Sequence, residues 1–315
     1  MKSGLIVVAL AGLQTTPAPP PPDTEIFLAS LSASSSATAT PLTLGSPVNI
    51  TSNPGYDNQP SFTPDGRSVL FTSIRGGTQT DIYRYDIAVE RVARVTNTPE
   101  SEYSPTVTPD GAHISVIRVE ADGTQRLWRF TIDGAQPELV LADVKPVGYH
   151  AWADDHTLAL FVLGQPGGTA SRFPTLQIAD TRTGKADSFV AGINRSIQRI
   201  PGGRTISFVQ RIPSTQQGGM PTLKISELDP ASRRVTFLVN AVAGATEADC
   251  AWTPDGMLLM ADKDVLHGWR RGQADWSRLA DLAQLGLHGV SRLAVSPSGD
   301  RIALVTEAAT RSAGL

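Results

Sequence analysis

The chain has 315 residues, of which 40% are hydrophobic, with 28 glycines, 23 prolines and a formal net charge of −3. Glycine and proline in these numbers are typical of many short strands joined by tight turns, and long helices are not expected. The slight negative charge and the lack of any basic run exclude an electrostatic surface for nucleic acid or for an anionic membrane. A disulfide scaffold is excluded as well, because Cys250 is the only cysteine.

The N-terminal segment has the pattern of a signal peptide. Lys2 precedes an apolar stretch from Leu5 to Leu13, and a polar, Pro-rich tract follows from Gln14 to Pro22. Nine apolar residues are too few to span a bilayer but fit a signal-peptide core. We therefore expect residues 1–22 to be a signal peptide with a Pro-rich spacer, and the protein to be periplasmic or secreted, without stable membrane insertion. A cytosolic protein with an apolar start remains the alternative, because no clean Ala-x-Ala cleavage site follows.

One short motif then recurs along the chain: an apolar residue, a variable residue, and Pro-Asp-Gly or a relative of it. The six anchors occupy residues 62–66, 107–111, 152–156, 199–203, 252–256 and 295–299. Pro64 and its counterparts are separated by 45, 45, 47, 53 and 43 residues. This is the period of a four-stranded propeller blade.

Each anchor predicts a tight turn between two strands, because proline presets φ, aspartate bonds to its own backbone, and glycine accepts positive φ. Runs rich in Val, Ile, Leu and Phe follow the anchors and predict buried second strands. Second strands are expected at residues 68–73, 113–118, 157–163, 205–210, 257–261 and 301–306. Third strands are expected at 81–87, 125–132, 175–180, 222–228 and 265–270, and fourth strands at 91–96, 137–141, 186–191, 234–239 and 276–281.

The sixth blade lacks two strands, because only one strand follows the anchor at Pro297. Residues 25–31 and 47–51 have the character of the missing third and fourth strands. Pairing them with the C-terminal strands would leave no open sheet edge. We predict an all-β fold, a single six-bladed β-propeller over residues 23–307, closed by its N-terminal strands. Residues 32–40 would form a surface loop, and residues 308–315 a frayed tail.

Residues 62–77, FTPDGRSVLFTSIRGG, and residues 81–86, DIYRYD, resemble the repeat of TolB-type, WD-like propellers. The resemblance extends through the repeats over about residues 25–306 and is weaker at 152–156 and 199–203, where the Pro-Asp-Gly turn is altered. Members of this group include periplasmic interaction proteins and propeller domains attached to serine peptidases. The resemblance therefore implies the fold, and function only loosely.

The sequence shows no standard catalytic or cofactor motif, such as Gly-x-Ser-x-Gly, His-Glu-x-x-His, Cys-x-x-Cys or a phosphate-binding loop. Propeller enzymes draw site residues from several blades, so enzymatic activity stays open, and we favour its absence. We assign no catalytic residue and no metal ligand.

The family resemblance places the first strand of each blade along a central tunnel, with a ligand-binding mouth where these strands begin. Five residues before the anchor position, all six blades carry hydrogen-bonding side chains: Gln59, Ser104, Tyr149, Ser196, Asp249 and Arg292. Seven residues before it, three blades carry carboxylates: Asp57, Glu102 and Glu247. We take these nine residues as candidate ligand-binding positions. The carboxylates could hold a cation or a basic partner residue, although any water-exposed strand entrance would also be polar.

His150, with Asp154, Asp155 and His156, is the densest group of metal-capable side chains. A structural role explains it better, because His150 aligns with apolar positions of other blades and residues 154–156 replace a turn. By the same alignment, Cys250 is expected to be a small buried residue.

We therefore expect an exported, non-enzymatic binding or scaffold propeller of the cell envelope. It would be a monomer without a cofactor that engages a protein or peptide partner through its rim and tunnel mouth. One alternative is a propeller enzyme, a lactonase, lyase or hydrolase, that uses polar residues of several blades. Another is a propeller that binds a glycan or a small molecule.

Overall fold

The computed structural model describes residues 21–33, 42–164 and 172–308. Nearly all regular structure in these ranges is β-strand, apart from one short 3-10 segment, η1 (Ala283–Leu285). The predicted signal segment lies almost entirely outside the described residues, as do most of the predicted loop at 32–40 and all of the predicted tail except residue 308. No helix among the described residues is long and apolar enough to cross a membrane.

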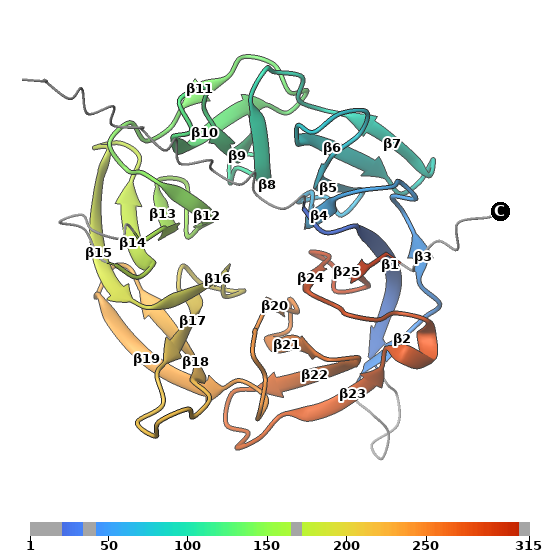
Figure 1. Ribbon diagram of the computed structural model, residues 1–315, viewed down its shortest axis with the longest axis vertical. Coiled ribbons are helices and arrows are strands. Elements are labelled where there is room, and N and C mark those ends of the chain that lie inside the picture. Colours follow the sequence, from blue (N-terminus) through green and yellow to red (C-terminus); the bar gives the residue numbers. More distant parts are fainter. Residues whose placement is uncertain (1–20, 34–41, 165–171, 309–315) are drawn as a thin grey trace, which may run out of the picture.

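Six antiparallel sheets surround a central axis as the blades of a propeller (Figure 1). Blades I to V each consist of four consecutive strands, and the first of them lies nearest the axis. Their bounds are β4 (Asp57–Phe62), β5 (Ser68–Ser73), β6 (Asp81–Asp86) and β7 (Arg91–Arg94) in blade I; β8 (Ser101–Val107), β9 (His113–Val119), β10 (Gln125–Thr131) and β11 (Glu138–Leu139) in blade II; β12 (Val147–Trp152), β13 (Thr157–Val162), β14 (Thr175–Asp180) and β15 (Lys185–Ala191) in blade III; β16 (Ile193–Arg199), β17 (Ile206–Ile212), β18 (Thr222–Asp229) and β19 (Arg234–Asn240) in blade IV; and β20 (Cys250–Trp252), β21 (Met257–Asp262), β22 (Val265–Arg270) and β23 (Ser277–Asp281) in blade V.

Blade VI joins the two ends of the chain, as predicted. Its inner strands are β24 (Arg292–Val295) and β25 (Arg301–Glu307), and β25 pairs with β1 (Thr24–Ala33) in register from Thr24↔Glu307 to Ser30↔Arg301. The outer edge of β1 pairs with two short strands, β2 (Leu42–Leu44) and β3 (Val48–Asn49). The sequence predicted only the second of these, because β2 has three residues and stands directly after a Ser/Ala/Thr-rich stretch.

The hydrophobic core is divided among the junctions between blades. The second strands are the most deeply buried, and all six residues of β5 are buried. Phe71, Phe130 and Phe208 are among the largest side chains with almost no exposed surface. A second strand has a neighbouring blade on each face, which explains why its sequence reads as a continuous apolar run and not as an alternation.

The inner strands begin irregularly, and this positions the site. Register shifts interrupt the pairing of β4 between Asn58 and Ser61, of β8 between Tyr103 and Thr106, and of β16 between Ile193 and Ile197. In blades I and II a non-glycine residue within the shift takes positive φ: 57° at Gln59 and 53° at Ser104. Such bulges redirect side chains locally, so the strict two-residue alternation fails at the tunnel mouth.

Candidate functional site

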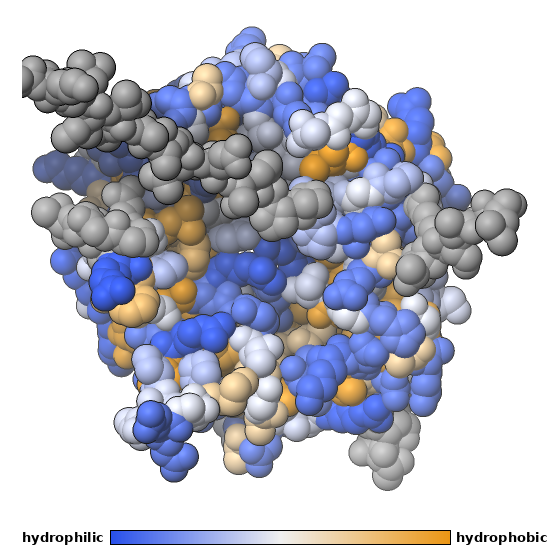
Figure 2. Space-filling view, viewed as in Figure 1, coloured by the Kyte–Doolittle hydropathy of each residue, from blue (hydrophilic) through white to orange (hydrophobic). Residues whose placement is uncertain are grey.

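Six side chains, one from each blade, gather around the axis at the end of the molecule where the inner strands begin. We call this set the axial ring: Tyr56, Tyr103, Tyr149, Arg195, Asp249 and Arg292. Tyr56 directly precedes β4, and Asp249 directly precedes β20; the other four lie in the first strands of their blades. In the view along the axis, hydrophilic residues surround the recessed centre of the molecule (Figure 2). Tyr149, Asp249 and Arg292 are three of the nine positions proposed from the sequence.

An ion pair joins the ring members of blades IV and V. Arg195 donates to Asp249 Oδ2 through Nε at 2.9 Å and through Nη2 at 2.7 Å. The Asp249 side chain is 14% exposed, so this pair is largely shielded from water. Burial opposes the charge on Arg195, but the neighbouring Asp249 carboxylate outweighs it and raises the pKa of the guanidinium above its ordinary value.

A second contact crosses the tunnel between opposite blades. Arg292 of blade VI donates from Nη2 to the Tyr149 hydroxyl of blade III at 2.8 Å. The guanidinium carbon of Arg292 also lies 5.1 Å from the centroid of the Tyr149 ring, within the range of a cation–π interaction. Since blades III and VI face each other across the axis, this pair bridges the tunnel.

The ring has an excess of positive charge. Arg195 and Arg292 face one carboxylate, that of Asp249, which leaves a net charge of +1 when the tyrosines are neutral. Burial raises the pKa of the Tyr56 hydroxyl to about 12, partly opposed by the charges of Arg292 and Arg195. Tyr56 is therefore neutral at physiological pH. This local positive charge stands in a chain whose overall charge is −3.

Asp57 lies at the junction between blades VI and I. Its Oδ2 accepts a hydrogen bond from Asn53 Nδ2 at 3.3 Å, and its Oδ1 lies 3.5 Å from Arg75 Nη2. Its side chain is fully buried. Burial raises the pKa of this carboxyl to about 6.

Glu102 occupies the equivalent place between blades I and II. It accepts hydrogen bonds from the hydroxyls of Thr96, at 3.0 Å, and Thr98, and Arg118 Nε lies 3.7 Å away. Burial raises the pKa of Glu102 to about 7. The third carboxylate, Glu247, accepts from Asn194 Nδ2 at 2.9 Å between blades IV and V.

The three candidate carboxylates thus have separate partners at separate junctions. Within residues 21–33, 42–164 and 172–308, no group of three or more His, Cys, Asp or Glu side chains is placed to hold a metal ion. A shared cation between the carboxylates remains a hypothesis that this arrangement does not favour.

The remaining three candidates connect neighbouring inner strands. Gln59 Oε1 accepts from the Ser104 amide at 2.8 Å, which links blades I and II. Ser196 Oγ accepts from the Cys250 amide at 3.1 Å, which links blades IV and V. The Gln59 and Ser196 side chains therefore point toward adjacent blades, whereas Ser104 takes part through its backbone amide, and its buried hydroxyl has no hydrogen-bond partner among the described residues.

Sequence alignment missed Tyr56, Tyr103 and Arg195. Tyr103 and Arg195 stand one residue before the aligned position, in the two blades where β8 and β16 carry a register shift. Tyr56 precedes Gln59 by three residues. Allowing the alignment to slip at a suspected bulge would have found Tyr103 and Arg195, but no local residue pattern marks these bulges.

Comparison with known proteins bears on the fold. The family model described as TolB beta propeller domain matches residues 2–178, more than half of the chain. The chain belongs to this family. The family assignment agrees with the six-bladed closure and with the resemblance of the repeats.

The individual proteins that resemble this TolB-family propeller either match it over a short stretch or share little of its sequence. A stretch of 28 residues is 64% identical to the Tol-Pal system protein TolB of Bordetella pertussis, and it covers 9% of this chain and 6% of that protein. Among solved structures, a putative TolB from Agrobacterium tumefaciens has a TM-score of 0.64 at 16% identity, over 91% of this chain and 98% of its own. An oligogalacturonate lyase from Vibrio parahaemolyticus has a TM-score of 0.51 at 11% identity, over 90% and 98%. At such identities the structural likeness shows the fold alone.

His150 lies between blades II and III in this TolB-family propeller. Its Nε2 is 2.7 Å from Ser115 Oγ, and the same hydroxyl accepts from Trp152 Nε1 at 2.9 Å. Burial lowers the pKa of His150 to about 3, so the imidazole is neutral. Cys250 is also buried, which raises the pKa of its thiol. Neither residue faces the axial ring.

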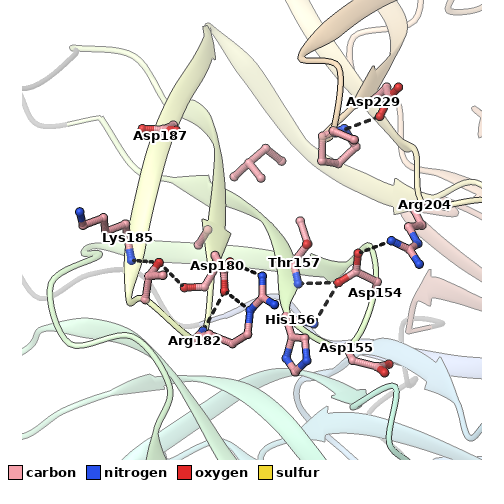
Figure 3. Close-up of a pocket in the computed structure, with 15 residues that line it drawn as sticks. Asp154, Asp155, His156, Thr157, Asp180, Arg182, Lys185, Asp187, Arg204 and Asp229 are labelled. Atoms are coloured by element: carbon pink, nitrogen blue, oxygen red, sulfur yellow. Dashed lines mark hydrogen bonds and ion pairs between the residues drawn. The ribbon is translucent and has the colours of Figure 1, made fainter.

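A concavity lies at the other end of the propeller, between the turns of blades III and IV (Figure 3). Its volume is about 580 Å³. Asp154 Oδ1 accepts from the amides of His156 and Thr157 at 3.0 and 2.9 Å, and Asp180 pairs with Arg182 at 2.7 Å. These carboxylates therefore stabilise turns and local ion pairs. The axial ring is the stronger candidate, because its charges converge from six blades.

Proposed function

We propose that this protein is an exported, non-enzymatic binding propeller of the cell envelope that engages a protein or peptide partner through the axial ring and the rim around it. The observation that carries this proposal is the convergence of six polar or charged side chains, one per blade, on the tunnel mouth. Bonds between neighbouring blades are also made outside the ring, and the contact of Arg292 with Tyr149 joins blades that do not pack against each other. All six ring members belong to one chain, so a monomer can form the site.

The proposed compartment is the periplasm or the cell exterior. It is supported by the signal-peptide pattern of residues 1–22. Membership of the TolB β-propeller family supports it as well, since one relative bears the name of a Tol-Pal system protein. That relative is matched over only 6% of its length, so its partners are no more than a guide to the kind of partner sought here.

A propeller enzyme is the second candidate, because oligogalacturonate lyases share the fold at a TM-score of 0.51. The groups of the ring suit binding better than proton transfer. Tyr56 has its pKa raised to about 12, far from the neutral value that favours a general base. Asp249 is held in an ion pair with Arg195, and His150 lies away from the ring.

Site-specific photo-crosslinking in the source cells tests the proposal. Ser291 is exposed and adjacent to Arg292, and Ser298 is exposed in the turn at the opposite end of the same blade. We expect a photoreactive residue at position 291 to yield a covalent adduct with a defined protein, identified by mass spectrometry. The same residue at position 298 should yield none. Equal adducts from both positions, or no protein adduct from either, would contradict a partner at the tunnel mouth.

A further inference from the structure

Arg292 is a partly buried cation whose side chain has few partners. Its side chain is 14% exposed. A guanidinium has five N–H donors, yet within the described part of the chain Arg292 makes one hydrogen bond, to the Tyr149 hydroxyl. Asp249 Oδ1 lies 3.9 Å from Arg292 Nη1, too far for a hydrogen bond. No Arg292 nitrogen is among the fully buried side-chain atoms without a partner in the described residues, so its remaining donors are accessible to a ligand that carries acceptors.

Asp249 does not satisfy these donors, because its Oδ2 receives two donors from Arg195 and its Oδ1 lies 3.9 Å from Arg292 Nη1. The tyrosines of the ring add donors and no charge. Among the described residues, the hydroxyls of Tyr56 and Tyr103 have no hydrogen-bond partner. The ring therefore combines a net charge of +1 with several unmatched donors, a composition that suits an anion.

We propose that the axial ring binds one carboxylate of a peptide partner, held by Arg292 and adjacent to Arg195. This inference rests on the proposed function and specifies the chemistry of its partner. A carboxylate presents two acceptor oxygens in the plane that a guanidinium fork requires. Its single negative charge balances the ring, whereas a phosphate dianion would exceed the ring's charge.

A peptide fits this ring better than a sugar acid does. Sugar recognition relies on an open aromatic face, but Arg292 covers the face of the Tyr149 ring at 5.1 Å. Phe161 also packs against Tyr149, in a T-shaped arrangement with ring centroids 5.6 Å apart. A carboxylate on Arg292 would leave these contacts in place.

Asp249 then acts as an internal competitor. It holds Arg195 in the way that a ligand carboxylate would, and it lowers the charge of the ring from +2 to +1. Asp249→Asn should release Arg195 and raise the affinity for a carboxylate. A gain in affinity cannot result from misfolding, which makes this variant the most informative one.

Saturation-transfer NMR on the purified protein measures the weak affinities expected of short probes. The probes are acetyl-Gly-Glu-Gly-amide, with a side-chain carboxylate, acetyl-Gly-Gly-Gly with a free C-terminus, and acetyl-Gly-Gln-Gly-amide as the neutral control. We expect at least one charged peptide to bind the unmodified protein and the neutral peptide not to. Arg292→Gln should weaken binding tenfold or more, and Asp249→Asn should tighten it several-fold. The preferred charged probe identifies the carboxylate as a side chain or a C-terminus.

Arg301→Gln is the matched control, because Arg301 is in the same blade, begins β25 at the opposite end, and pairs with the exposed Asp300. It should leave affinity unchanged. If Arg292→Gln fails to fold, Arg292→Lys retains the charge without the fork and should still weaken binding. Equal binding of the neutral peptide, or weaker binding by Asp249→Asn, would overturn the inference. Binding of digalacturonate without binding of either charged peptide would overturn the peptide assignment and favour a carbohydrate ligand.

The two proposals can fail separately. Charged peptides that bind while position 291 yields no protein adduct would leave the carboxylate site and remove the protein partner. A protein adduct at position 291 with no carboxylate binding would support the protein partner and overturn the carboxylate site.

Discussion

The indole Nε1 of Trp252 donates a hydrogen bond to Ser207 Oγ at 2.9 Å, from the inner strand of blade V to the second strand of blade IV. The same pair recurs two blades away, where Trp152 Nε1 donates to Ser115 Oγ at 2.9 Å. Both serines are buried. The same kind of contact, a core tryptophan bonded to a second-strand serine, therefore joins the blades at two junctions of the propeller.

Replacing Trp252 by Phe should destabilise the fold through this bond. The variant keeps an aromatic side chain but removes the donor to Ser207, at an expected cost of about 1–3 kcal/mol including the smaller ring. A double-mutant cycle with Ser207→Ala, followed by urea denaturation, isolates the pair. We expect a coupling energy of about 1 kcal/mol. Additive effects of the two substitutions would show that the bond contributes nothing.

Gly134 should tolerate no side chain, because a Cβ there would lie 1.9 Å from the carbonyl oxygen of Val95 in the neighbouring blade. Gly123 is the matched control: its φ is +82°, against +84° at Gly134, but nothing lies within 4 Å of its Cβ position. Gly123→Ala should cost about 1 kcal/mol from backbone strain alone. Gly134→Ala should cost clearly more, as a lower melting temperature. Equal losses would mean that the junction can open without penalty.

Glu102 should lower stability as pH rises toward neutrality, while buried His150, whose pKa is lowered to about 3, contributes the opposite slope up to about pH 6.5. The pKa of Glu102 is raised to about 7 from an ordinary value of 4.5. Between these values the folded state keeps a proton that the unfolded state has released, so unfolding becomes easier with rising pH, by at most about 1.4 kcal/mol per pH unit. Asp57, with its pKa raised to about 6, should add to this slope at lower pH.

Glu102→Gln should remove this contribution, so that the stability of the variant falls less with rising pH than that of the unmodified protein, measured by urea denaturation from pH 5 to pH 8. Glu138→Gln is the control, because Glu138 is an exposed glutamate on the outer strand of the same blade. A variant at position 102 that keeps the full slope would show that another group is responsible.

Chelation should leave the melting temperature unchanged. The three carboxylates that could have shared a cation accept instead from their own partners: Asn53 at Asp57, Thr96 at Glu102 and Asn194 at Glu247. Metal quantitation and native mass spectrometry of the untreated protein provide the complementary measurement, with no stoichiometric ion expected. A drop in melting temperature on chelation, or one bound ion per chain, would restore the cation site and strengthen the enzyme alternative.

The sequence by itself determined the number, order and closure of the blades. A Pro-Asp-Gly turn depends on local backbone chemistry, so its recurrence after Phe62, Val107 and Trp252 could be read without knowing any contact. Closure followed from counting strands, because β25 needed a partner and residues 25–31 were the unpaired strand of the right character.

Only the tertiary structure decided which polar residues reach the axis. Alignment treated Ser104 and Asp249 as equivalent, yet in one blade a register shift begins at Tyr103, which interacts electrostatically with Tyr56, while in another Asp249 itself joins the ring. The contact between Arg292 and Tyr149 joins residues 143 positions apart, on opposite sides of a closed ring. Local pattern encodes turns and strands, whereas the bulges and the pairing of charges depend on how neighbouring blades pack, and that is set by the whole chain.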